Sequence, residues 1–189
     1  NLERDLALEI AVAQAGVQLD DAPYQHWKAH RYESYSPQWQ SRGFFMDTIE
    51  ITASWSQIPA MYERIRREVL ALDPGMYFGT HWSHVYPEGA CQYMTLRLPQ
   101  MDTAVALRLH REAWHMAQQA CLDLGGSISH HHGVGVFRNP WLRKELGAGL
   151  DLLQGLKDYL DPDNLFVPGK LALRPRAGAV DLEPQERAS

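Results

Sequence analysis

The order of strand and helix signals between residues 43 and 129 limits the folds open to this chain more than any other feature. β-branched and aromatic residues predict a first strand at 44–52, and an apolar stripe at helical spacing predicts a helix at 56–72. Two more β-favouring runs, Met76 to Tyr86 and Ala90 to Leu98, are separated by the turn triplet Pro87-Glu88-Gly89. These runs predict a hairpin.

A second helix, at 102–124, and a short strand, at 127–129, complete the series. The resulting order of strand, helix, strand, strand, helix, strand is that of the split βαβ or ferredoxin-like arrangement. We therefore expect an α+β fold in which helices cover one face of an antiparallel sheet. Many unrelated functions use this fold, so the function must be argued from the site.

Helical signals flank this unit on both sides. Apolar residues at helical spacing predict a helix from Leu2 to Gly16, and the aromatic segment 24–42 is expected to form a broken helix or an ordered loop. Asn139-Pro140 is expected to start a leucine-rich helix that continues to Asp161. Because glycine disfavours the interior of a helix, we expect close packing or a break near Gly147.

The composition is that of one ordinary domain, which we place at 1–173, followed by a flexible tail at 174–189. The net charge of -5 makes nucleic acid an improbable partner. Only Cys91 and Cys121 are present, and no apolar run reaches the roughly 18 residues of a membrane span, so we expect a cytoplasmic protein. The chain has no initiator Met, which fits a piece of a longer protein.

The chemically most distinctive segment is 125–135, in which His130, His131 and His132 stand between two pairs of glycines. Imidazole titrates near neutral pH, and glycine lets the backbone approach a ligand closely. If residues 128–132 are extended, side chains alternate between two faces, so His130 and His132 share one side and His131 points to the other. At most two of the three then address one site directly.

Three interpretations of the histidines stay open on the residues alone. They could form a catalytic or cofactor-facing site, lie on a polar surface without a role, or bind a metal. Zinc usually takes three or four ligands, and the triplet supplies at most two. A metal set would therefore need partners from the hairpin, where the available residues are His81, His84, Glu88 and Cys91.

Gly133-Val134-Gly135 is too short for a dinucleotide-binding fingerprint, because it lacks a third glycine and an acidic residue at the required spacing. It permits close approach of backbone N–H groups to a planar or anionic ligand. Tyr93, on the second hairpin strand, is either a core aromatic residue or a catalytic one. Its position in the fold must decide between them.

The segment 126–135 resembles the C-terminal part of the alkylglycerone-phosphate synthase (alkyldihydroxyacetonephosphate synthase) family, which belongs to the vanillyl-alcohol-oxidase type of FAD-dependent proteins. Trp141-Leu142 and the run 156–166 support the likeness, which extends over most of the chain from Phe44 to Leu171. Further matches are Tyr86 with Gly89-Ala90-Cys91-Gln92-Tyr93, similar to the family's Tyr-x-x-Gly-Ala-Cys-x-Tyr, and Asp47-Thr48-Ile49-Glu50 with Ala53-Ser54-Trp55.

The resemblance implies the substrate or cap domain of a two-domain enzyme, with FAD held mainly by an N-terminal domain that this chain lacks. It implies that Tyr93 removes a proton from the substrate carbon. The residues implied at the flavin, for contact and for stabilising charge, are His130, His131, His132, Gly133 and Gly135. The implied substrate is a small molecule such as a lipid-like glycerone phosphate, and the full-length protein is expected to be a homodimer. The isolated chain is expected to be inactive.

Two features leave the substrate open. Ser36 stands where the synthase family tends to carry an arginine that holds an anionic substrate group. A related branch that oxidises 2-hydroxy acids carries Glu-His-Gly where this chain has His131-His132-Gly133. One alternative is therefore an FAD-dependent dehydrogenase or oxidase of the lactate or glycolate type, and another is a free-standing metal- or ligand-binding module.

Overall fold

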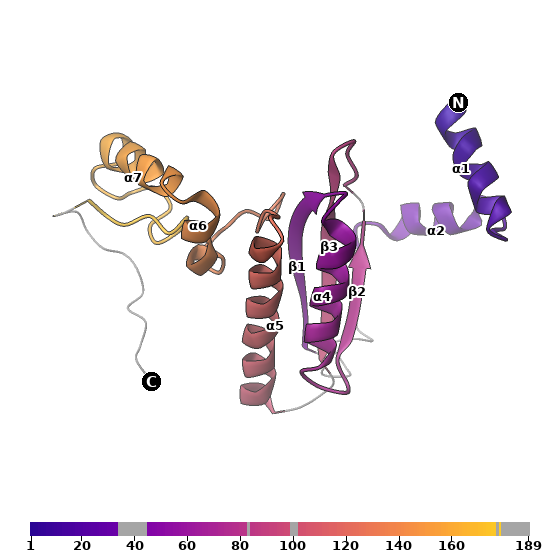
Figure 1. The fold of residues 1–189 in the computed structure, drawn as a ribbon, viewed down its shortest axis with the longest axis horizontal. Coiled ribbons are helices and arrows are strands. Elements are labelled where there is room, and N and C mark those ends of the chain that lie inside the picture. The colour runs from indigo at the N-terminus through magenta and orange to yellow at the C-terminus, as the bar shows by residue number, and fades with distance from the viewer. Residues whose placement is uncertain (34–44, 83, 99–101, 177, 179–189) are drawn as a thin grey trace. The chain divides into compact units, whose positions relative to one another are not determined.

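The structure is a computed structural model that describes residues 1–33, 45–82, 84–98, 102–176 and 178 (Figure 1). It divides into two compact units, Asn1–Arg42 and Gly43–Ser189. The described part of the first unit contains helix α1 (Leu2–Ala13) and helix α2 (Ala22–His30), neither of which has a buried residue. None of the described helices is long and apolar enough to cross a membrane.

The second unit contains an antiparallel sheet of β1 (Phe45–Ser54), β2 (Tyr77–His81) and β3 (Gly89–Leu98) in the order β1-β3-β2. Helices α4 (Ile58–Leu70) and α5 (Thr103–Asp123) pack together over one face of this sheet (Figure 1). The α+β prediction is confirmed.

The core lies between the sheet and these two helices, because the apolar face of the sheet packs there against the apolar sides of the helices. Ile49 and Ile51 alternate along β1, and Ile65 and Val69 share one side of α4, so that all four are fully buried. Burying each such side chain contributes about 1.5–3 kcal/mol. The alternate residues of β1 and β3 point to the opposite face of the sheet.

The predicted fourth strand is reduced to a single bridge between Thr52 and Ser127 at the outer edge of β1. The two residues exchange backbone hydrogen bonds of 2.8 and 3.0 Å. Gly126 makes this approach possible, because a Cβ atom there would lie 2.7–2.8 Å from Met61, Cys121 and the Thr52 carbonyl oxygen. The bridge gives the strand order expected of a ferredoxin-like arrangement, although the chain bends away immediately afterwards.

The hairpin is shorter than predicted on its first strand, which ends at His81 rather than Tyr86. The predicted helix at 139–161 divides into α6 (Asn139–Leu146) and α7 (Gly149–Leu160). Gly147 has φ of 52° at the junction, which confirms the expected break. Most of the predicted flexible tail, residues 177 and 179–189, and the whole of the segment 34–42 lie outside the described residues.

Candidate functional site

The site is built on the sheet face opposite α4 and α5, where Glu50 on β1 pairs in register with Tyr93 on β3. Glu50 is fully buried, because the segment after the Ser127 bridge passes over it. Its carboxylate accepts hydrogen bonds from the backbone N–H of His130, at 2.6 Å, and from that of His131. The Ser129 hydroxyl donates a third, at 3.3 Å.

This binding of successive N–H groups to one carboxylate explains why the expectation of an extended histidine segment is wrong. In an extended strand, neighbouring N–H groups point in opposite directions, whereas here both point at Glu50. Residues 130–132 form a series of bends instead. As a result, side chains of all three histidines gather with the aromatic residues of the hairpin.

Arg138, at the start of α6, fixes both ends of this loop. Its Nε donates to the Ile128 carbonyl oxygen and one of its terminal nitrogens to that of Gly133, each at 2.9 Å. Its other terminal nitrogen lies 3.7 Å from the Glu50 carboxylate, and its guanidinium lies over the Trp114 ring. Arg138 is only 6% exposed, so Glu50 and Arg138 form a buried pair that shapes the loop.

The predicted catalytic residues come together beside this pair. The Tyr93 ring stacks near the His131 ring, at 6.2 Å between centroids, and meets the edge of the His132 ring at 5.1 Å. His130 bonds through Nε2 to the Tyr86 hydroxyl at 2.9 Å, and its Nδ1 lies 3.0 Å from Nδ1 of His131. Tyr93 is half-buried, and its hydroxyl makes no hydrogen bond to any residue that the structure describes.

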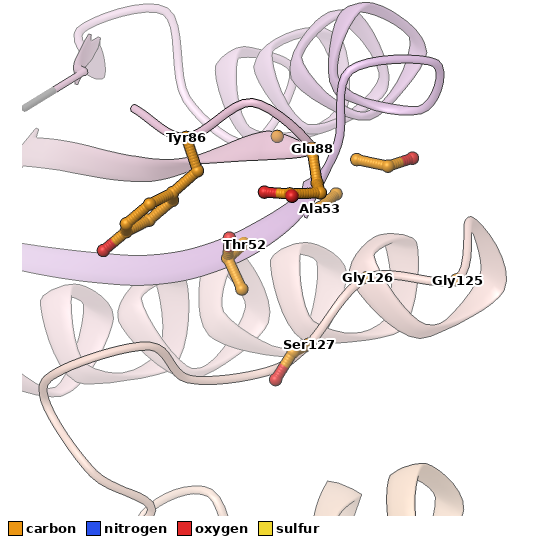
Figure 2. A pocket seen from close by; sticks show the side chains of 9 residues that line it. Thr52, Ala53, Tyr86, Glu88, Gly125, Gly126 and Ser127 are labelled. Atoms are coloured by element: carbon orange, nitrogen blue, oxygen red, sulfur yellow. The ribbon is translucent and has the colours of Figure 1, made fainter. Parts of the chain in front are cut away.

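An open pocket of about 320 Å³ adjoins the histidines on the side of Tyr86. Figure 2 shows Tyr86 and Glu88 on one side of β1 and Ser127 on the other, with Thr52 between them. Tyr86 lines this pocket and bonds His130, so it connects the pocket to the loop 128–133, which we call the histidine loop.

Gly133 and Gly135, both exposed, have φ of 74° and 57°, values that favour glycine. A Cβ atom at either position would meet no described atom within 4 Å. The glycines are therefore required by backbone conformation rather than by packing within this domain, and they leave the surface beside His132 open.

The electrostatics of the site keep Glu50 ionised. Burial by itself would raise the pKa of Glu50, but the N–H groups of His131 and His130 lower it below the ordinary value of 4.5, and the His132 and His131 rings lower it further whenever they are protonated. Burial also lowers the pKa of His132. The negative charge of Glu50 acts to raise this pKa, and the positive charges of His131 and Arg138 act to lower it. A neutral His132 imidazole can accept a proton.

A pH dependence of stability follows from the lowered pKa of Glu50. The unfolded state binds the proton more readily, so this stabilisation is complete above about pH 4.5 and is lost as the pH falls through the depressed folded-state pKa. In urea unfolding at several pH values, Glu50→Gln is expected to flatten the acid loss of stability. Glu112→Gln, which alters a surface ion pair with Arg108, should keep the parent slope. Parallel curves for the parent and Glu50→Gln would contradict this role.

Comparison with known proteins places this architecture in a family. The family model described as FAD linked oxidases, C-terminal domain, matches residues 2–171. The chain belongs to this family. As the description states, the family is FAD-linked, so FAD is the cofactor that membership implies.

Relatives of this FAD-linked oxidase C-terminal domain are much longer. Alkyldihydroxyacetonephosphate synthase of Trypanosoma brucei brucei is 27% identical over 182 residues, covering 93% of the domain and 30% of the relative. The FAD-linked oxidoreductase YgcU of Escherichia coli is 32% identical over 131 residues, covering 66% and 27%. A probable mitochondrial D-lactate dehydrogenase of Danio rerio is 37% identical over 71 residues, covering 37% and 14%. The domain thus spans less than a third of each, and the resemblance stated from the sequence is confirmed.

Sequence analysis missed three residues that shape the site. Glu50 was noted only as part of a matching motif, Arg138 was not considered, and Tyr86 was placed within a strand. A charged residue at the centre of a β-favouring run was the available signal for Glu50, because a charge on a buried strand requires a partner. Ser36 lies outside the described residues, so the substrate question that it raises stays open.

Proposed function

We propose that this domain forms the substrate side of the active site in an FAD-dependent oxidoreductase that resembles alkyldihydroxyacetonephosphate synthase. The observation that carries the proposal is the grouping of Tyr93 with His131 and His132 on a face that the domain's own helices leave uncovered. The proposed partner is an N-terminal FAD-binding domain in the same enzyme. The proposed full-length enzyme is a homodimer.

Tyr93 is proposed to remove a proton from the substrate carbon. Its hydroxyl is not committed to a hydrogen bond with a described residue, so it is available to a bound substrate. The rings of His131 and His132 lie beside it and are in contact with solvent, which gives the proton a route away from the reacting atoms. The backbone around them is held by Glu50 and Arg138, so the rings approach Tyr93 in a fixed arrangement.

The residues present fit a planar cofactor at this face. The exposed Gly133 and Gly135 leave room for a ring to approach the backbone, and His131 and His132 offer nitrogen atoms next to it. FAD would supply the capacity to accept and return electrons, which amino-acid side chains lack. The chain's own contribution is to position the substrate, to move a proton through Tyr93, and to stabilise charge with His130, His131 and His132.

A second candidate function is oxidation of a 2-hydroxy acid of the lactate or glycolate type. Its support is the match to a probable D-lactate dehydrogenase, which is 37% identical over 71 residues. Bleaching of the flavin absorbance in the full-length protein by D-lactate or glycolate, without added alcohol or acyl lipid, favours this candidate. Turnover of an acyl ester of dihydroxyacetone phosphate with a long-chain alcohol, and no bleaching by the acids, favours the synthase-like one.

The flavin contact itself is tested by His132→Ala in the full-length protein. We expect a shifted visible absorbance spectrum of bound FAD, because the imidazole beside the ring is replaced by solvent. His115→Ala is the matched control, since His115 lies on α5 next to Trp141 and outside the site. An unchanged spectrum in His132→Ala would contradict the proposal. So would stoichiometric retention of FAD by the isolated 189-residue chain, which is expected to be inactive without its partner domain.

A further inference from the structure

Four potential metal ligands meet where the histidine loop faces the hairpin. His84 comes from the hairpin loop, Cys91 from β3, and His130 and His131 from the segment that crosses Glu50. One ligand atom from each of the four side chains lies within 4.8 Å of those from the other three. The set differs from the one considered from the sequence, since His81, Glu88 and His132 are not in it.

The chemistry of these ligands selects a borderline-soft cation. Three imidazoles and one thiolate match the nitrogen and sulfur ligands that Zn²⁺ prefers in tetrahedral sites, whereas Mg²⁺ and Ca²⁺ prefer oxygen. Ligand atoms on one tetrahedral zinc are about 3.3–3.8 Å apart, given bonds of about 2.0–2.3 Å. Nδ1 of His130 and Nδ1 of His131 already lie 3.0 Å apart, so modest side-chain adjustments would close the set.

The surroundings of the cluster also suit a cation. Cys91 is 1% exposed and forms the floor, while the His131 side chain is 36% exposed and leaves an entry from solvent. A carboxylate oxygen of Glu50 lies 3.1 Å from Nδ1 of His131 and 3.8 Å from that of His130, close enough to offset positive charge. The Tyr86 hydroxyl bonds Nε2 of His130, the kind of outer contact that orients a ligating imidazole.

We propose that His84, Cys91, His130 and His131 form a binding site for Zn²⁺ or a divalent cation of similar softness. As the metal–sulfur bond forms, the Cys91 thiol gives its proton to solvent. The bound cation joins the hairpin to the histidine loop and adds to the contacts that the Tyr86 hydroxyl and the His84 ring already make with the loop. This site shares His130 and His131 with the proposed active site, and it goes beyond the proposed function because it requires neither FAD nor the proposed partner domain.

Titration of the purified 189-residue chain with Co²⁺, followed by displacement with Zn²⁺, tests the proposal. We expect one equivalent of Co²⁺ to produce visible bands of a tetrahedral centre together with a thiolate-to-cobalt charge-transfer band, and Zn²⁺ to remove both. Cys91→Ser should abolish the charge-transfer band. His84→Ala should weaken Co²⁺ binding by more than about 10-fold, because loss of even an outer-shell partner of a metal ligand lowers metal affinity by about that much.

Two variants serve as controls. Cys121→Ser removes the other thiol, which is buried on α5 and outside the cluster, and His115→Ala removes a histidine elsewhere; both should bind Co²⁺ like the parent. Circular dichroism establishes whether each variant is folded. If Cys91→Ser does not fold, His84→Ala still tests the site, because His84 lies in a loop and is less important for packing than the buried Cys91. Absence of the cobalt bands, or their survival in Cys91→Ser or His84→Ala, would overturn the metal site. Neither result depends on the flavin spectrum, so the two proposals fail separately.

Discussion

Replacing Tyr93 with phenylalanine is expected to lower kcat of the full-length flavoprotein by about 10²–10⁴-fold, the usual contribution of a positioned acid or base. The substitution removes one hydroxyl and leaves the ring that stacks near His131 and meets His132. Substrate binding and FAD content should therefore stay close to those of the parent. Steady-state turnover, with either the acyl ester of dihydroxyacetone phosphate or a 2-hydroxy acid, provides the measurement.

Tyr86→Phe is the matched control for this experiment. It removes a second phenol near the histidines, but one whose hydroxyl is already bonded to His130 at 2.9 Å. We expect a smaller loss of turnover than in Tyr93→Phe, because only the orientation of His130 is disturbed. A parental rate in Tyr93→Phe, or a greater loss in Tyr86→Phe, would reverse the roles of the two tyrosines.

The second large effect is expected from Arg138→Met, which should lower the free energy of unfolding by about 3–5 kcal/mol. The substitution leaves the fully buried Glu50 carboxylate without its cationic partner and frees the Ile128 and Gly133 carbonyl oxygens. Methionine retains much of the apolar stem, so the loss reports on charge and hydrogen bonding more than on volume. Urea unfolding of the purified chain measures it.

Arg143→Met supplies the comparison on the same helix. Arg143 pairs with Asp151 at the surface, where both side chains are more than half exposed, so we expect a change within about 1 kcal/mol. The double variant Glu50→Gln with Arg138→Met should lose less free energy of unfolding than the sum of the two single variants, because it leaves no unpaired buried charge at this pair. A loss below about 1 kcal/mol for Arg138→Met would show that Arg138 does not stabilise the loop.

Local patterns predicted the scaffold well, because each element is encoded by its own residues. The stripe of α4, the break at Gly147 and the order of strands and helices along the chain all follow from nearby sequence. The first hairpin strand was predicted too long, because its β-favouring run continues past His81 into a loop. Residue preference does not reveal where cross-strand pairing ends.

The site was predicted only in part, for a similarly physical reason. The triplet, Tyr93 and the two loop glycines could be named from the sequence, and the structure brings Tyr93 next to His131 and His132. The conformation of the triplet could not be predicted from the sequence, because it depends on Glu50, which precedes His130 by 80 residues. A contact over that separation has no local signature, so the assumption of an extended segment was the natural error.

Gly126 has a consequence for attempts to give this domain a new activity. It leaves no space for even a methyl group beside Met61 and Thr52, although it carries no reactive group itself. A larger residue there would push the chain off β1 and displace every histidine downstream, so a mutant library aimed at the triplet should keep glycine at this position. Val136, which is exposed by 60%, suits variation in such a library, whereas the Phe137 ring packs against Trp114 and should be kept.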